Sequence, residues 1–90
     1  MNNPLLTTLE IISFIRSVSP MGASAAELQA QFGISIATLK RHLAEARELG
    51  ADIQSEKVQA VSRYVLRNHH EISLRLNRWL ELERSRDLTS

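Results

Sequence analysis

The stretch from residue 23 to residue 50 constrains the fold most, because it carries start and stop signals for two short helices in close succession. Ser24 and, three residues later, Glu27 form a capping box, which predicts a helix that begins at Ala25. Gly33 can adopt a positive φ without steric cost, so we expect it to end this helix and to reverse the chain. A second helix should therefore follow directly and cross the first closely.

This second helix, residues 35–49, is expected to have an inward and an outward face. Ser35 is its predicted N-cap, and Gly50 is its predicted C-cap. The 3.6-residue period turns one stripe toward the core, namely Ile36, Leu39, Leu43 and Ala46. The opposite face holds Ala37, Thr38, Arg41, Ala44, Glu45 and Glu48, with Lys40 and His42 on its flanks. Small alanines beside hydrogen-bonding and basic side chains favour insertion into the major groove of DNA.

A further helix is predicted at each end of the chain. Asn3 as N-cap and Pro4 at the first helical position open the N-terminal helix, which should run to about Val18. Its apolar residues cover more than half of its circumference, so we expect it to pack on two sides. Asn68 is the expected cap of the last helix, which should continue to about Arg86. The apolar residues of this last helix are Ile72, Leu76, Trp79 and Leu80 in one stripe, with Leu74 and Leu82 outside it.

Two β-prone segments predict a small hairpin between these helices. Residues 51–54 and residues 62–66 have the composition and alternation of strands, and they should pair antiparallel with Ile53 facing inward. Residues 55–60 contain no glycine and no Asn-Gly pair. We therefore expect a longer polar loop between the strands rather than a two-residue turn.

Four motifs, taken together at their spacing, resemble a known type of DNA-binding domain. They are Phe32-Gly33-Ile34-Ser35, Thr38-Leu39-Lys40-Arg41-His42-Leu43, Leu49-Gly50-Ala51-Asp52-Ile53 and Tyr64-Val65-Leu66. They look like the winged helix-turn-helix of DeoR-type regulators, and equally like the winged domains that precede WYL sensor domains. The resemblance covers about Leu9 to Leu66. It departs from the usual pattern at Gln29, where a small alanine is common, and at His42, where the DeoR type usually has aspartate.

This resemblance implies a mainly α fold with a small β-hairpin. A three-helix core and a wing would be followed by an additional C-terminal helix. It also implies that the connector at residues 21–23 forms a short strand beside the wing.

Composition limits the classes of protein to which this chain can belong. Its 90 residues, 43% hydrophobic and 23% charged, suit one globular unit. It has no cysteine, and the neighbouring His69 and His70 lack further ligands to complete a metal site. The N-terminus lacks the basic region of a signal peptide, and no apolar run is long enough to span a membrane. These features predict a cytoplasmic protein of a bacterium or phage.

The net charge of +1 is low for a protein that binds nucleic acid, because neutralisation of phosphates supplies most non-specific affinity. Positive residues are concentrated in the second helix and the segment after it, namely Lys40, Arg41, Lys57, Arg63 and Arg67. This distribution favours specific or dimer-dependent binding to double-stranded DNA over tight binding by a single copy.

These patterns predict a sequence-specific transcriptional regulator, a repressor that inserts residues 35–49 into the major groove as a homodimer. We expect Thr38 and Arg41 to reach base edges over the thin surface at Ala37. The expected phosphate contacts are Ser35, Lys40 and His42 from the helix, with Lys57 and Arg63 from the wing. Residues 1–68 would form the DNA-binding domain. Residues 69–90 would form a dimerisation helix that uses Ile72, Leu74, Leu76, Trp79, Leu80 and Leu82.

Two alternatives stay open at the level of sequence. A winged-helix module can also bind protein, as a subunit of a replication or segregation complex, and Glu45 and Glu48 on the outward face are compatible with that function. The C-terminal helix can also cap the core of a single copy. No catalysis, cofactor, metal or small-molecule ligand is expected, because the sequence shows no nucleophile-base pair, phosphate-binding glycine loop or ligand cluster.

Overall fold

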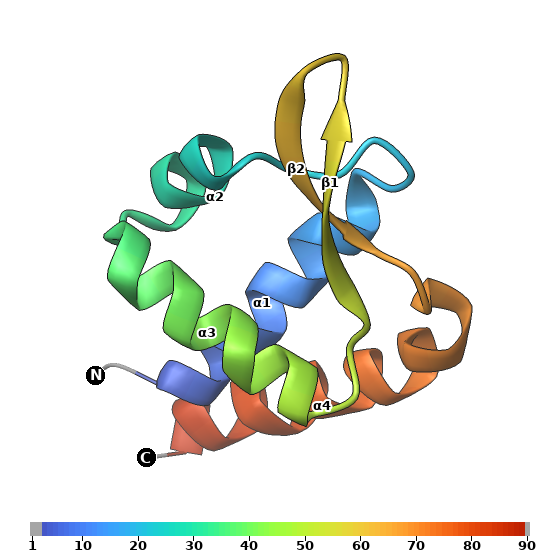
Figure 1. The fold of residues 1–90 in the computed structure, drawn as a ribbon. Helices are drawn as coiled ribbons and strands as arrows, with labels where there is room; N and C mark the ends of the chain where they lie inside the picture. Colours follow the sequence, from blue (N-terminus) through green and yellow to red (C-terminus); the bar gives the residue numbers. More distant parts are fainter. Residues whose placement is uncertain (1–2, 90) are drawn as a thin grey trace.

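Four helices and one antiparallel hairpin make up the computed structural model, which describes residues 3–89, without the side chains of Val58 and residues 87–89. In chain order the elements are α1 (Pro4–Ser17), α2 (Ala25–Phe32), α3 (Ile36–Glu48), β1 (Ile53–Val58), β2 (Val61–Leu66) and α4 (His69–Thr89). α1 lies between α3 and α4, and the hairpin projects beyond the helices (Figure 1). This is a winged helix-turn-helix with one additional helix, as predicted.

The helix starts follow the local capping signals. The Asn3 side chain accepts a hydrogen bond of 3.1 Å from the N–H of Leu6, and Pro4 occupies the first turn of α1. Ser24 Oγ accepts from the N–H of Glu27 at 3.1 Å, and Glu27 Oε1 accepts from the N–H of Ser24 at 3.4 Å. The predicted capping box is thus confirmed, and it satisfies two N–H groups that an α-helix leaves without intrahelical partners.

Glycines with positive φ end both helices of the central pair. Gly33 has φ 62° directly after α2, and Gly50 has φ 108° just beyond α3. At the end of α3 the N–H of Gly50 donates to the carbonyl of Arg47, and the N–H of Ala51 donates to that of Ala46, each at 3.1 Å. These two bonds form a Schellman motif, which turns the chain away from the helix axis and into β1.

The core confirms that α1 packs on two sides. Its buried residues Leu9, Ile11, Ile12 and Ile15 join Leu28 of α2, Leu39, Leu43 and Ala46 of α3, Ile53 and Leu66 of the hairpin, and Ile72, Leu76 and Leu80 of α4. Because α4 contributes three of these side chains, it belongs to the same hydrophobic core as the preceding elements.

This arrangement corrects the predicted dimer interface. Ile72, Leu76 and Leu80 are buried against the rest of the chain, because the wide apolar surface of α1 accepts the apolar stripe of α4 within one copy. The prediction that these three residues contact a second copy is therefore wrong. Trp79 is half-buried at the edge of the core, whereas Leu74 remains 83% exposed and Leu82 remains 54% exposed.

The hairpin pairs antiparallel with Ile53 opposite Leu66, and Ile53 is buried as predicted. The connector before α2 adds the expected short strand. Ala23 bridges Tyr64, with N–H···O distances of 3.0 and 2.8 Å in the two directions. Gly22 allows this approach, because a Cβ at that position would lie 2.5 Å from the carbonyl oxygen of Tyr64. The wing is thereby attached to the chain segment that leads into α2.

The tip of the wing differs from the prediction of a longer loop. β1 and β2 extend to the pair Val58–Val61, so only Gln59 and Ala60 form the turn. Both have positive φ, 51° and 66°, as in type I′ hairpin turns. The prediction failed because the twist of paired strands selects this turn even where the sequence offers no glycine.

Asn68 also has a different role from the expected one. Its carbonyl oxygen accepts from the N–H of Ile72, so it precedes α4 as predicted, but its side chain does not cap that helix. Instead, Asn68 Oδ1 accepts from the N–H of Asp52 at 2.9 Å and Nδ2 donates to the carbonyl of Gly50 at 2.8 Å. The side chain thus joins the start of α4 to the connection between α3 and β1.

The turn at the wing tip yields a test of the fold. Left-handed backbone costs a residue with a Cβ about 1–2 kcal/mol, whereas asparagine and glycine accept it readily. Replacing Gln59 by Asn and Ala60 by Gly should therefore raise the free energy of unfolding by about 1 kcal/mol, as measured by urea denaturation. Ala30→Gly in α2 is the control, because the same change within a right-handed helix should lower stability by about 1 kcal/mol. A loss of stability in the wing variant would contradict the two-residue turn.

Candidate nucleic-acid interface

The outward face of α3 is exposed along its whole length. Its exposed residues are Ile36, Ala37, Lys40, Arg41, Ala44, Arg47 and Glu48, with Ser35 exposed at the N-cap. The two alanines keep the middle of this surface low, so the longer side chains of Lys40 and Arg41 project beyond it. Ile36 was expected in the core but is 42% exposed, because it is the first residue of α3 and lies at the margin of the buried stripe.

Ser35 and Thr38 form a small hydrogen-bonded unit at the start of this face. Ser35 Oγ accepts from the N–H of Thr38 at 3.2 Å and donates to Thr38 Oγ1 at 3.1 Å. The predicted N-cap is therefore confirmed. Thr38 is half-buried on the flank of the helix, and its hydroxyl accepts from Ser35 while keeping its own proton to donate.

His42 was predicted to contact phosphate, and the structure shows that this placement is wrong. The side chain is only 5% exposed, and its Nδ1 lies 2.7 Å from Oγ1 of Thr8, a fully buried residue of α1. The 3.6-residue period carries position 42 past the flank and toward α1, where the two helices pack. His42 thus links α3 to the core by a polar contact with α1, and hydrophobic periodicity alone did not reveal it.

Burial also affects the titration of His42. Desolvation of the charged imidazolium lowers the pKa of His42 below its usual 6.5, with an opposing effect from Glu45 and a smaller lowering effect from Arg41. The folded protein therefore holds this imidazole neutral at neutral pH. A neutral ring can share one proton with the Thr8 hydroxyl without placing a charge in the core.

The two basic residues predicted on the wing have different surroundings. Lys57 is exposed on β1. Arg63 on β2 instead points toward α2, where its Nη1 donates to Oε1 of Glu27 at 3.1 Å and to the carbonyl of Gly22 at 3.3 Å. Arg63 therefore fastens the wing to the start of α2, a role that sequence reasoning missed because its partners lie far away in the chain.

Charge is unevenly distributed over the candidate interface. Residues 35–44 contain Lys40 and Arg41 and no acidic residue, and the N-terminus of α3 adds the positive end of a helix dipole. Glu45 and Glu48 follow only in the second half of the helix. On the wing, Arg67 forms an ion pair with Glu56, so these two charges compensate each other. Arg47 also lies in this second half, between the two acidic residues. The part of the surface with only basic charges thus comprises the first half of α3 and Lys57.

A metal site and a membrane span receive no support from the described residues. Within residues 3–89 there is no group of three or more His, Cys, Asp or Glu side chains that could hold a metal ion. Among the helices described there, none is long and apolar enough to cross a membrane.

A glycine turn that joins two capped helices, the second with an exposed basic face and a hairpin beside it, defines a helix-turn-helix DNA-binding domain. Comparison with known families agrees with this class. The chain matches the model of the HTH domain over residues 7–59, more than half of its length, and it belongs to this family. No curated protein and no solved structure matches the chain. The narrower resemblance to DeoR-type and WYL-associated domains stays a prediction.

The buried Thr8–His42 contact generates a prediction about stability. Thr8→Val removes one partner of a buried hydrogen bond and should lower the free energy of unfolding by about 1–3 kcal/mol. Adding His42→Leu should cost less than the sum of the two single changes, because no buried polar group is then left without a partner. Additive losses in urea denaturation would show that the two side chains are not coupled.

The same pair of side chains predicts a pH dependence. Since the pKa of His42 is lower in the folded protein, the unfolded chain binds the proton first as the pH falls. The contribution of neutral His42 is thus complete above its unfolded pKa of about 6.5 and is lost progressively toward its lowered folded pKa. Urea denaturation at about pH 7.5 and about pH 5 should show a smaller pH-dependent loss for His42→Gln than for the unmodified protein. An equal loss in both would contradict the assignment.

Proposed function

We propose that this protein is a sequence-specific transcriptional regulator that places α3 in the major groove of double-stranded DNA. The observation that carries the proposal is the first half of α3, where Lys40 and Arg41 project from a thin, acid-free and exposed surface. In helix-turn-helix proteins the N-terminal residues of the second helix contact base edges, and membership of the HTH family supports the same use here. The proposed role is binding and not catalysis.

The side chains divide into two groups by their chemistry and position. Arg41 has the fork geometry that pairs with guanine O6 and N7, and the Thr38 hydroxyl can donate to a neighbouring base edge. Ala37 and the exposed part of Ile36 offer apolar contact for thymine methyl groups. Phosphate contacts come from Ser35, Lys40 and Lys57, the last from the wing. Arg63 acts indirectly, by holding the wing on α2.

The proposed regulator acts as a repressor and a homodimer in the cytoplasm of a bacterium or phage. Occupying a promoter blocks other proteins, so repression needs nothing beyond DNA binding. A second copy doubles the phosphate contacts available to a chain whose net charge is only +1. Leu74 and Leu82 of α4, which are 83% and 54% exposed, supply apolar surface for that second copy. This smaller patch replaces the interface predicted from sequence.

The proposed readout is tested by comparing two adjacent basic residues. A duplex selected from random sequences and a scrambled duplex are titrated with each variant. Arg41→Ala should lose about 1–3 kcal/mol on the selected duplex and much less on the scrambled one, because it removes a base contact. Lys40→Ala should weaken both by a similar amount, because it removes a phosphate contact. Equal losses on both duplexes for Arg41→Ala would exclude its base-reading role. No binding of the unmodified protein to any duplex would favour the protein-binding alternative.

The proposed dimer is tested by charging its apolar patch. Leu74→Glu combined with Leu82→Glu should convert the dimer to a folded monomer in light scattering, because like charges would face each other across the two-fold axis. Binding to a two-half-site duplex should fall accordingly. Met21→Glu is the matched control, since Met21 is also an exposed apolar residue but lies in the connector before α2. A monomeric unmodified protein, or a double variant that stays dimeric, would contradict this interface.

A further inference from the structure

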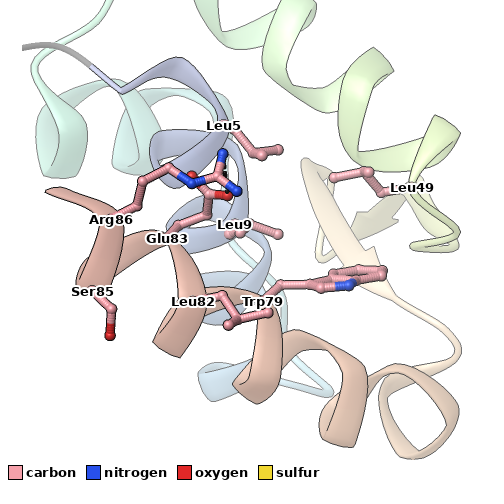
Figure 2. A pocket seen from close by; sticks show the side chains of 8 residues that line it. All are labelled: Leu5, Leu9, Leu49, Trp79, Leu82, Glu83, Ser85 and Arg86. Carbon is pink, nitrogen blue, oxygen red and sulfur yellow. Dashed lines mark ion pairs between the residues drawn. The ribbon is translucent and has the colours of Figure 1, made fainter. Parts of the chain in front are cut away.

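An apolar groove lies where the first half of α1, the end of α3 and the second half of α4 meet. Its volume is about 380 Å³. Figure 2 shows side chains from α1, from Leu49 directly after α3 and from α4 around it. The lining residues are Leu5, Leu9, Leu49, Trp79 and Leu82, together with the polar residues Glu83, Ser85 and Arg86. The groove therefore depends on contacts between the two ends of the chain.

The dimensions and lining of this groove suit a small molecule. Ligand sites in proteins commonly have volumes of about 300–1,000 Å³, apolar walls and a few polar groups that orient the ligand. A protein helix, with a diameter of about 10–12 Å, needs far more space than this groove offers. The half-buried indole of Trp79 and the exposed side of Leu82 are apolar surfaces that a ligand would cover.

Glu83 gives the groove a specific electrostatic character. Glu83 is only 7% exposed. Removing a carboxylate from water to this extent costs free energy, which partners of the carboxylate must offset. Asn3 Nδ2 donates to its Oε2 at 3.1 Å, and Arg86 Nη1 lies 3.5 Å from its Oε1. The side chain of Arg86 is itself 73% exposed, so water screens part of its attraction to this carboxylate. A second cation beside Glu83 would add to the compensation of its charge.

We propose that this groove binds a small hydrophobic amine. The hydrocarbon part lies against Leu49, Trp79 and Leu82, and the ammonium group points toward the carboxylate of Glu83. The hydrophobic part provides affinity, while the charge-assisted hydrogen bond to Glu83 selects an amine over a neutral or anionic molecule of the same shape. This proposal rests on the groove and not on DNA contacts, but it shares Leu82 with the proposed dimer, so ligand and second copy would compete for that side chain.

Three probes with one hydrocarbon frame test the proposal: 4-phenylbutylamine, 4-phenylbutan-1-ol and 4-phenylbutyrate. Trp79 is the single tryptophan of the chain and lines the groove, so its fluorescence reports binding at this site. The amine should bind about ten-fold more tightly than the alcohol, with the butyrate weakest, as expected for one charge-assisted contact. Glu83→Gln should remove this difference. Glu81→Gln is the matched control, because Glu81 is exposed on the same helix outside the groove and should retain the difference.

A second pair of variants keeps the test decisive if Glu83→Gln does not fold. Leu82→Arg places a cation at the rim of the groove and should weaken the amine more than the alcohol. Met21→Arg makes the same change at an exposed apolar residue outside both the lining and α4, and it should leave the order of the probes unchanged. Equal affinity for all three probes, tighter binding of the butyrate, or no fluorescence response to the amine would overturn the proposal. Tighter binding of the butyrate would instead identify an anion site at Arg86.

Discussion

The packing of α1 between α3 and α4 is the interaction on which the rest of the structure depends. Leu9, Ile11, Ile12 and Ile15 are essentially inaccessible to solvent, which requires neighbours on more than one side of the helix. α3 covers one side, and α4 covers another with its own apolar stripe. Because protein interiors tolerate few voids, the positions of these helices are coupled through α1. The orientation of α3 therefore depends on residues of α1 and α4 that lie outside its exposed face.

A few polar contacts fix the relative positions of elements that the apolar packing alone does not determine. The buried pair Thr8–His42 fixes α3 against α1, and Arg63 fastens the wing to Glu27 and Gly22. Asn68 joins the start of α4 to the chain that leaves α3. Each contact joins two segments that are distant in the sequence. Each therefore restricts the movement of one segment relative to the other. These contacts fix how the exposed surface of α3 is placed, as the proposed reading of base edges would require.

Features that depend on residues near in sequence could be predicted, whereas features that depend on residues far apart in sequence could not. Helix ends depend on residues within one turn, so Ser24, Gly33 and Ser35 were sufficient to place the central pair. The position of His42 depends on Thr8 of another helix, and that of Arg63 depends on Glu27, neither of which periodicity identifies. The turn at Gln59 and Ala60 follows from strand twist rather than from the preferences of those two residues. The stripe of α4 was recognised correctly, but periodicity does not tell whether the same chain or a second copy covers it.

The amino-acid sequence by itself determined the order of the helices, the caps of the first three, the antiparallel pairing of the hairpin and the outward position of Lys40 and Arg41, because caps and hydrophobic periods act locally. The last helix extends to Thr89, beyond its predicted end at about Arg86. Only the tertiary structure decided that Ile72, Leu76 and Leu80 complete the core, that His42 is buried, and that a groove ending at Glu83 lies between three helices. These outcomes depend on which surfaces of distant segments fit together. Whether a residue is buried depends on how all the helices and strands pack together, so the sequence of a single segment does not determine it.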